Sequence, residues 1–558
     1  MKASPVFIHL FTSVFILISC QKSENRSLGD IDLLRGDITL CGSGEFGEVS
    51  FGLSCELNVR ETFDLAIALL HSFEYDQAEK AFVKVIDTDP NCAMAYWGVA
   101  MANFHSLWFQ SGNDYLIKGN KILDRVSSIQ KSERESDYIN AINGFYQNWE
   151  SESRQIRIAR FEKRMKNVYQ KYNQDKEAAI FYALALRAAA DPGDKSYKNQ
   201  KTSGEILESI YPDQPNHPGI AHYIIHNYDY PELAELALPA ARRYAEIAPA
   251  SAHAQHMPSH IFTRLGLWDE SIASNIKMIS SAQCYAESLD STARWDEELH
   301  GIDYLVYAYL QTGQNVKTQE QLSQLKTFKR IFPTNFKVAY TIAAVPARIV
   351  LENRNWKEAA DLVLPEIEID WQLYPWQRSI LHFTRAMGSV RLGNIAATEE
   401  ELEILKLNRL ELLEKNDDYK ANQVNIQIKT IQAWIAFELG EESKALTLMS
   451  SAAEMEYNTA KHAVTPGEVL PAGELYGDML LSLNRADEAL KVYQYDLSQH
   501  PNRFNGIYGA AKAAVALGEP EIASKYFFQL VELAKATNEG RKEVREAKEY
   551  LQTDSYPN

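Results

Sequence analysis

The sequence lacks most of the short motifs by which enzymes are identified. It has no glycine-rich phosphate loop between a strand and a helix, no Gly-x-Ser-x-Gly nucleophile motif and no Cys-x-x-Cys pair. It also lacks clusters of Lys and Arg, and its formal net charge is −18. We therefore expect no nucleic-acid partner, and we interpret the acidity as a contribution to solubility.

Alternating apolar and polar residues, which are typical of half-buried strands, are also scarce. Only 26 Gly and 19 Pro interrupt the 558 residues, and apolar residues recur at helical spacing along most of the chain. The sequence therefore predicts an all-α protein.

The one long apolar run lies at the start of the chain, from Val6 to Ile18 after a single Lys. It is too short to span a bilayer securely and is typical of a signal peptide, assigned to residues 1–19. The following Cys20 completes a segment, residues 17–20, that resembles the bacterial lipobox, in which the cysteine is acylated. The alternative is a free or buried cysteine after a short membrane anchor.

This resemblance implies a protein of the bacterial cell envelope that contacts the membrane only through its lipid anchor. Gln21, rather than Asp, in the second mature position is similar to the pattern that directs lipoproteins to the outer membrane. Residues 20–58 are interpreted as a tether and N-terminal segment.

Export permits disulfides among the remaining cysteines. Cys55 and Cys92 lie near the starts of predicted helices that are close in the array, and Cys41 to Cys55 is the competing pairing. Cys284 is left over and is expected to be a buried small hydrophobe.

A 34-residue period organises the rest of the chain. The clearest unit runs from Val59 to Cys92. Its small apolar residues let the two predicted helices approach each other, its larger ones fill the space between them, and Pro90 ends the second helix. The same pattern of packing positions fits four further segments: Pro218–Ser251, Ala252–Tyr285, Leu470–Arg503 and the chain from Phe504 onward.

This pattern resembles the tetratricopeptide repeat family, which implies a right-handed solenoid of helical hairpins. Repeats are expected over residues 59–298, with helical insertions at 110–175 and 283–298, and again over 299–558. Several longer segments, among them 92–98, 217–226 and 256–262, are similar to a group of exported bacterial tetratricopeptide proteins without an assigned activity.

Six of the 13 histidines lie between His217 and His260. His222 and His226 are spaced i, i+4, and His256 and His260 repeat that spacing 34 residues later. The resemblance places these four at the fifth and ninth residues of two units, where side chains face the concave groove. It also places six further residues along that groove: Asp229, His253, Arg264, His300, Asp303 and Tyr307.

Imidazoles at i, i+4 can reach one metal ion, so His222, His226, His256 and His260 are candidate ligands of a single ion, with zinc and copper the first to test. Asp229 or Asp303 would then orient a ligand ring. Two alternatives remain open: neutral histidines that bind a peptide or an anion, and simple packing between helices. Pro258 is a weakness, since the second pair loses its geometry if a helix starts there.

Other polar residues give weaker signals. Glu454, His462 and Glu474 gather near the last repeats, and His105 with Trp108 ends an aromatic helix; both groups are interpreted as structural.

The sequence therefore predicts a lipid-anchored solenoid that binds a protein segment or small ligand at its histidine patch, with or without a transition metal. The alternatives are a metal-dependent enzyme, either a hydrolase or an oxidoreductase, and a purely structural scaffold.

Overall fold

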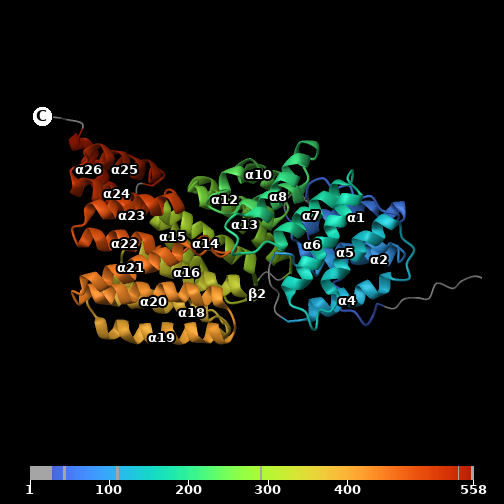
Figure 1. Ribbon diagram of the computed structural model, residues 1–558, viewed down its shortest axis with the longest axis horizontal. Coiled ribbons are helices and arrows are strands. Elements are labelled where there is room, and N and C mark those ends of the chain that lie inside the picture. Colours follow the sequence, from blue (N-terminus) through green and yellow to red (C-terminus); the bar gives the residue numbers. More distant parts are fainter. Residues whose placement is uncertain are drawn as a thin grey trace, which may run out of the picture.

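The computed structural model describes residues 28–39, 41, 45–107, 112–289, 292–537 and 540–554. In this part of the chain, α-helices follow one another as antiparallel hairpins that stack into a superhelix (Figure 1). The predicted all-α solenoid is confirmed. The signal peptide and the proposed lipidation site, Cys20, lie outside the described residues.

The N-terminal half contains the helices η1 (Leu57–Val59), α1 (Arg60–His71), α2 (Tyr75–Thr88), α3 (Ala93–Ala102), α4 (Asp114–Val126), α5 (Glu133–Tyr146), α6 (Arg154–Lys171), α7 (Lys176–Ala188), α8 (Lys198–Ile210), η2 (Tyr211–Asp213), α9 (Pro218–Tyr228), α10 (Ala234–Ile247), α11 (Ala252–His256), α12 (Pro258–Leu265) and α13 (Trp268–Leu289).

The C-terminal half contains α14 (Asp296–Gln311), α15 (Asn315–Leu325), α16 (Phe336–Glu352), α17 (Trp356–Ala360), η3 (Trp371–Leu373), α18 (Pro375–Arg391), α19 (Ile395–Glu414), α20 (Asp418–Glu438), α21 (Glu442–Tyr457), α22 (Ala472–Ser482), α23 (Ala486–Gln499), α24 (Phe504–Leu517), α25 (Pro520–Leu533) and α26 (Lys542–Asp554). Two short strands, β1 (Arg294–Trp295) and β2 (Ile331–Phe332), pair in parallel.

Both predicted insertions are continuous with the array. Helices α4 to α6 pack in succession between α3 and α7, so residues 110–175 extend the solenoid where they are described. The second insertion lengthens α13 to Leu289 and ends in β1.

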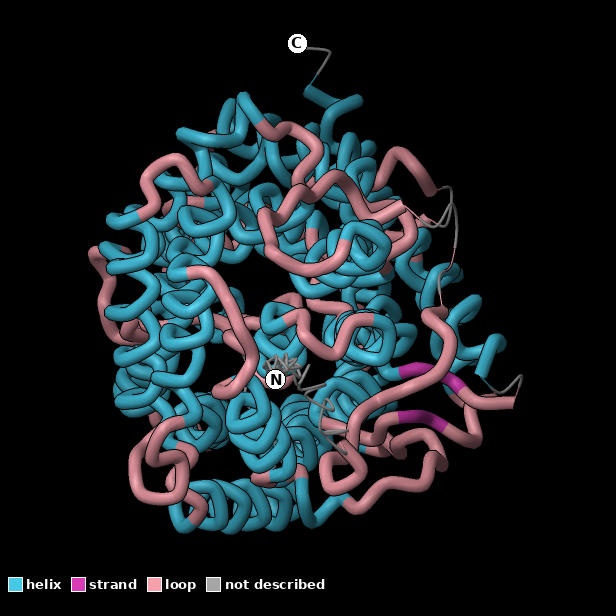
Figure 2. Tube along the Cα trace, turned by 90° about the vertical axis from the view of Figure 1, so that its right-hand side faces the viewer, coloured by secondary structure: helices cyan, strands magenta, loops and turns pink. Residues whose placement is uncertain are grey.

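Helices that are far apart in the sequence contact each other and close the turns of the superhelix. Helix α9 packs on α1, and α24 packs on α14. The second closure includes a hydrogen bond from the indole of Trp268 to the backbone oxygen of Asn502, at 2.7 Å. Viewed end on, the helices surround the centre of the molecule (Figure 2).

Two disulfides fasten the N-terminal segment. Cys55 is bonded to Cys92, with Cα atoms 4.8 Å apart, which is one of the two pairings expected. Cys284, expected to be unpaired, is bonded to Cys41 instead, so that prediction was wrong. The sequence could not show this because the two residues are 243 positions apart and no repeat relates them.

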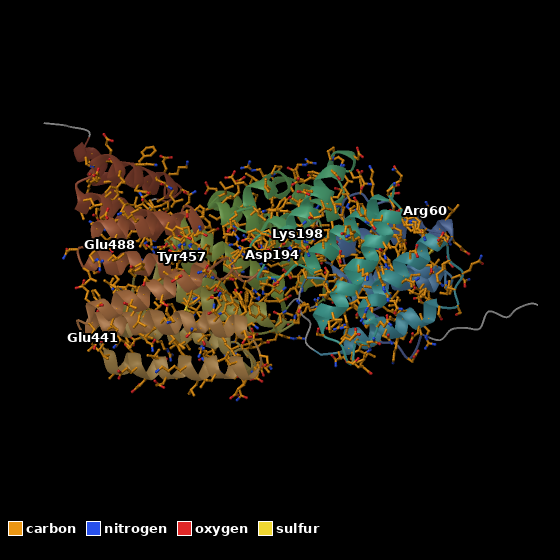
Figure 3. All side chains as sticks on the ribbon, in the orientation of Figure 1. Arg60, Asp194, Lys198, Glu441, Tyr457 and Glu488 are labelled. Carbon is orange, nitrogen blue, oxygen red and sulfur yellow. A yellow bond between two sulfur atoms is a disulfide. The ribbon has the colours of Figure 1, made fainter. Side chains whose placement is uncertain are left out.

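Charged side chains cover the outside of the solenoid, as Glu441 and Glu488 illustrate (Figure 3). The exposed position of these charges is consistent with the interpretation that the acidity contributes to solubility. Within the described residues, no helix combines the length and apolar composition needed to cross a bilayer.

Candidate metal centres

Three imidazoles converge where α9 meets α11. His226 Nε2 lies 3.0 Å from His222 Nε2, and His253 Nε2 lies 3.1 Å from the same atom. His222 and His226 come from one face of α9, and His253 comes from the first turn of α11. We call these three residues centre 1.

The tautomer of His222 is set by its other ring nitrogen. Nδ1 lies 2.6 Å from the backbone oxygen of His71, which can only accept a hydrogen bond. Nδ1 therefore carries the proton, and the Nε2 lone pair points at the other two rings. Burial lowers the pKa of His222 to about 3, so the ring is neutral at physiological pH.

A second set of three imidazoles lies where α11, α12 and α14 meet. His256 Nε2 is 3.0 Å from His260 Nε2, and His300 offers a nitrogen within 4.8 Å of both. The side chains are 0% to 6% exposed. We call these three residues centre 2.

In centre 2, both close nitrogens present lone pairs to each other. His260 Nδ1 lies 3.0 Å from the Asp229 carboxylate and donates to it. His256 Nδ1 lies 2.9 Å from Asn275 Oδ1. The Asn275 amide is oriented by its own donor bond to the backbone oxygen of Ser271, so His256 Nδ1 is the donor. The two Nε2 lone pairs therefore face each other at 3.0 Å, which is repulsive unless a cation lies between them.

Protonation does not relieve this contact. Burial, and then the neighbouring His260, holds the pKa of His256 well below its usual range, and burial also lowers the pKa of His260. Both rings are therefore neutral near pH 7, which is the form in which imidazoles can ligate a metal ion.

An aromatic ring lies against each centre. Phe73 contacts His222, His226 and His253, with ring centroids 4.4 to 5.8 Å apart. Its φ of 58° is left-handed and belongs to the turn between α1 and α2, and Gly313 and Asn484 have the same conformation in the equivalent turns of other hairpins. Tyr304 has the corresponding place in centre 2, with centroids 4.7 to 5.4 Å from the three rings.

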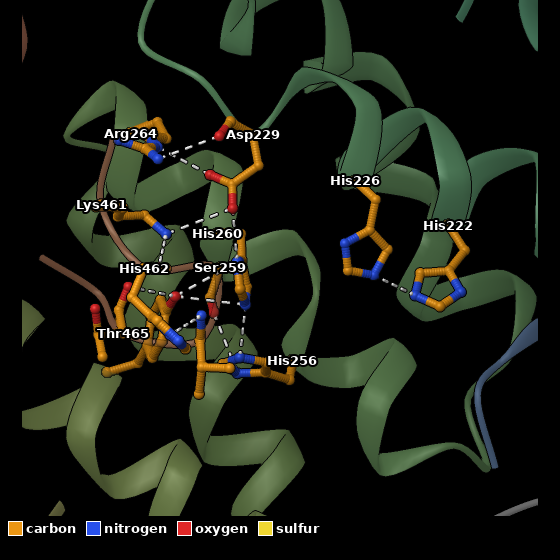
Figure 4. Close-up of polar contacts among 12 residues, drawn as sticks. His222, His226, Asp229, His256, Ser259, His260, Arg264, Lys461, His462 and Thr465 are labelled. Carbon is orange, nitrogen blue, oxygen red and sulfur yellow. Dashed lines mark hydrogen bonds and ion pairs between the residues drawn. The ribbon is translucent and has the colours of Figure 1, made fainter. Parts of the chain in front are cut away.

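The prediction that His222, His226, His256 and His260 enclose one ion is not what the structure shows. The two pairs lie apart (Figure 4). Each takes its third imidazole from a residue expected only to line the groove. The third residues are His253 and His300. The nitrogens of each i, i+4 pair approach the second residue of the following repeat, and the two pairs do not approach each other.

The two centres are the same constellation, one repeat apart. In each, the fifth and ninth residues of one unit meet the second residue of the next unit: His222 and His226 meet His253, and His256 and His260 meet His300. In the unit after these, the fifth and ninth places hold Asp303 and Tyr307, which bind arginines.

Asp303 and Tyr307 are both buried, and both interact with residues outside the two centres. Asp303 forms an ion pair with Arg348, and Tyr307 accepts a hydrogen bond from Arg503 at 2.8 Å. Asp303 is 1% exposed and Tyr307 is 3% exposed. Neither lines an open groove.

Asp229 and Arg264 stay close to centre 2. Arg264 Nε donates to Asp229 Oδ1 at 2.9 Å, while Asp229 Oδ2 accepts from His260. Lys461 Nζ approaches the same carboxylate at 3.4 Å, and burial lowers the pKa of Lys461 to about 8. Sequence analysis missed Lys461 because the contact joins residues 232 positions apart.

A further buried group supports centre 1. Glu177 accepts from His71 Nε2 at 3.0 Å and from His217 Nε2 at 2.9 Å, and His71 Nδ1 contacts the Tyr223 hydroxyl. This arrangement holds His71, whose backbone oxygen orients His222. His217 belongs to the histidine-rich window, but nothing in the sequence singled out Glu177.

The weaker candidates have structural surroundings. Glu474 pairs with buried Arg503, and His105 packs on Tyr75 with ring centroids 4.1 Å apart. His462 stacks on Phe336. Trp108 lies outside the described residues.

No protein-family model and no curated protein matches the chain. Similar solved structures include yeast Tom70, at 10% identity and a TM-score of 0.33, covering 89% of this chain and 96% of that one. The Cut9–Hcn1 hetero-tetramer of the APC/C matches at 11% identity and a TM-score of 0.31, covering 88% and 90%. Naa15/Naa10 bound to HypK-THB matches at 10% and 0.24, covering 89% and 92%. Scores this low carry no functional information.

Proposed function

We propose that this protein binds two transition-metal ions, one in centre 1 and one in centre 2. The observation that carries the proposal is the pair of Nε2 lone pairs of His256 and His260, fixed 3.0 Å apart by Asn275 and Asp229. Hydrogen-bonded partners that fix the ring tautomer are typical of histidines that ligate metals.

The shortest nitrogen spacings in each centre are close to those of ligands that share one ion. With metal–nitrogen bonds of about 2.0 to 2.1 Å, two nitrogens of a tetrahedral site lie roughly 3.3 Å apart. The observed 3.0 and 3.1 Å differ from this by a few tenths of an ångström. Imidazole ligands suit zinc and copper, which we would test first.

Burial argues against the predicted binding of a peptide at the histidines. His222 and His256 have no exposed surface, and His226, His260 and His300 are 3% to 7% exposed. His253 is the only one of the six that is partly exposed. A peptide would have to displace packed helices to reach the other five, whereas an ion needs only the nitrogens.

The two disulfides support the proposed location in the cell envelope, since structural disulfides persist in oxidising compartments. Attachment to the outer membrane through Cys20 belongs to the same proposal.

The test is metal analysis of the soluble form that lacks residues 1–20, loaded with zinc or with copper and freed of loosely bound ions. We expect two equivalents per chain. The double change His222→Ala and His226→Ala should remove one, and His256→Ala with His260→Ala should remove the other. His382→Ala, a histidine on α18 paired with Glu401 outside both centres, is the matched control. Folded protein that holds no ion under either condition would refute the proposal.

The number of ligands favours a catalytic site over a structural one. Structural zinc sites close with four protein ligands, whereas catalytic sites keep three and leave a position for water or substrate. Each centre here consists of three imidazoles. If that position is open, azide should change the absorption spectrum of the Co(II)- or Cu(II)-loaded protein, and an unchanged spectrum would indicate a closed site.

A further inference from the structure

The two centres differ in how far their ligands are enclosed. In centre 1, His253 is partly exposed, and the other two histidines are buried. The ligands of centre 2, His256, His260 and His300, are 0% to 6% exposed. Each centre has three imidazoles, so the difference lies in access and not in the kind of ligand. Solvent meets centre 1 at His253, whereas packed side chains enclose centre 2.

The ligands of centre 2 are held by the packing of three helices. His256, His260 and His300 come from α11, α12 and α14, and α11 packs on α14. The Tyr304 ring packs against all three imidazoles, and its hydroxyl donates to the Thr465 backbone oxygen at 3.2 Å. An external ligand could therefore reach centre 2 only after these helices had separated.

Centre 1 can open through one side chain. His222 and His226 both come from α9, so His253 is the one ligand that comes from another helix. It lies in the first turn of α11, where Ser251 caps the helix and donates to Glu74 at 2.6 Å. The backbone of this turn is therefore held in place. A rotamer change at His253 would open one coordination position while the other two ligands keep theirs.

We infer that centre 1 passes its ion to a partner protein that presents a histidine side chain, whereas centre 2 retains its ion. This inference rests on the proposed binding of metal in both centres. The partner's neutral imidazole would donate a nitrogen lone pair to the ion, and the bond from His253 Nε2 would break. Further ligands of the partner would then replace His222 and His226. Neutral imidazoles replace neutral imidazoles, so no electron and no proton is transferred.

The chemistry of the centre decides which side chain the partner presents. An ion held by imidazoles suits an imidazole acceptor, whereas carboxylates suit harder ions such as magnesium and calcium. In the oxidising compartment proposed for this chain, cysteine side chains tend to form disulfides, which leaves histidine as the available ligand. The partner does not need to enter between packed helices, since it reaches only the position of His253.

The test is rescue of two matched variants by a blocked peptide, acetyl-Gly-His-Gly-amide, which represents the histidine of a partner. His253→Ala and His300→Ala each remove the third imidazole of one centre. Competition with a chromophoric chelator measures zinc affinity with and without the peptide. We expect the peptide to raise the zinc affinity of centre 1 in His253→Ala at least tenfold. It should change that of centre 2 in His300→Ala less than twofold, and acetyl-Gly-Ala-Gly-amide should rescue neither variant.

Release of zinc from the parent protein gives an independent measurement. With both centres loaded, one ion should leave at a rate that rises in proportion to the peptide concentration, because the peptide displaces His253. The other should leave at a rate independent of that concentration, because separation of the helices limits it. The double change His256→Ala and His260→Ala should leave only the peptide-dependent phase.

Several results would overturn the inference. Among them are rescue of His300→Ala as strong as that of His253→Ala, rescue of neither variant, and release of both ions at rates independent of the peptide. Parent protein that binds no zinc would instead refute the proposed centres. Circular dichroism checks that both variants fold, and if one did not, the release measurement on the parent protein would decide alone.

Discussion

His256 and His260 keep their nitrogens 3.0 Å apart although one residue ends α11 and the other lies in α12. Met257, between the helices, has φ −52° and ψ −35°, which is helical geometry. Pro258 takes the first position of α12, where the missing N–H costs no hydrogen bond. The i, i+4 spacing therefore persists through the break that made this pair doubtful.

Asn275 should control metal affinity without binding the metal. Replacing it by Leu removes the acceptor for His256 Nδ1, so the ring can adopt the wrong tautomer. We expect metal affinity at centre 2 to fall roughly 10- to 100-fold, with centre 1 unchanged. Competition with a chromophoric chelator measures both.

Asn227→Leu provides the control for that experiment. Asn227 is as buried as Asn275, but it donates to Ser203 and not to a histidine. An equal loss of affinity in both variants would indicate general destabilisation and contradict the positioning role.

The metal-free protein should lose stability in mild acid. Burial holds the pKa of all six centre histidines below the ordinary 6.5, so the folded state binds fewer protons than the unfolded state. Stability is then lost as pH falls below about 6.5, by at most about 1.4 kcal/mol per pH unit for each histidine. Urea unfolding in a chelator, from about pH 7.5 to about pH 5.5, measures this slope.

One histidine of the six can be isolated in the same experiment. His300→Asn removes a single titrating group, so the slope should decrease by about one histidine's share. A slope that does not differ from that of the parent protein would show that folding does not lower the pKa of His300.

Gly219 should be required for centre 1. A Cβ there would lie 2.6 Å from His71 Nδ1, and His71 is held by Glu177 and Tyr223. Gly219→Ala should cost about 1 to 3 kcal/mol of stability and weaken metal binding at centre 1, since His71 orients His222. Thermal unfolding and chelator competition measure the two effects.

Gly52→Ala is the matched control, because its Cβ would meet only Arg134, at 4.0 Å. If Gly219→Ala retained full affinity at centre 1, the link from His71 to His222 would not matter for binding.

The two disulfides should differ in their contribution to stability. They join residues 37 and 243 positions apart, and loop-closure entropy gives upper values of about 4 and about 5.5 kcal/mol. Changing Cys41 and Cys284 to Ser should therefore lower the urea midpoint more than the same change at Cys55 and Cys92. The reverse order would show that the entropy of the unfolded chain is not the main source of the stabilisation by these disulfides.

The sequence predicted the helical class and both i, i+4 pairs, since these depend on local spacing. It did not predict which imidazoles meet. His253 and His300 share the second place of their units, and that equivalence was a usable signal for the third ligand of each centre. The contacts of Glu177 and Lys461 depend on long-range packing, which no local pattern encodes.

Cys284 shows the same limit. Its partner lies in an extended segment without periodicity, so no repeat phase could locate it. Helix positions follow from propensity and pattern, whereas the route of an irregular segment follows from many side-chain contacts along its path.

Each centre takes ligands from two successive repeats, so a bound ion would fix the angle at which one hairpin meets the next. Because α11 contributes to both centres, three consecutive units would be held in a single orientation. The pitch of this part of the coil would then respond to metal supply, and the molecule's overall length in solution would change when the ions are removed.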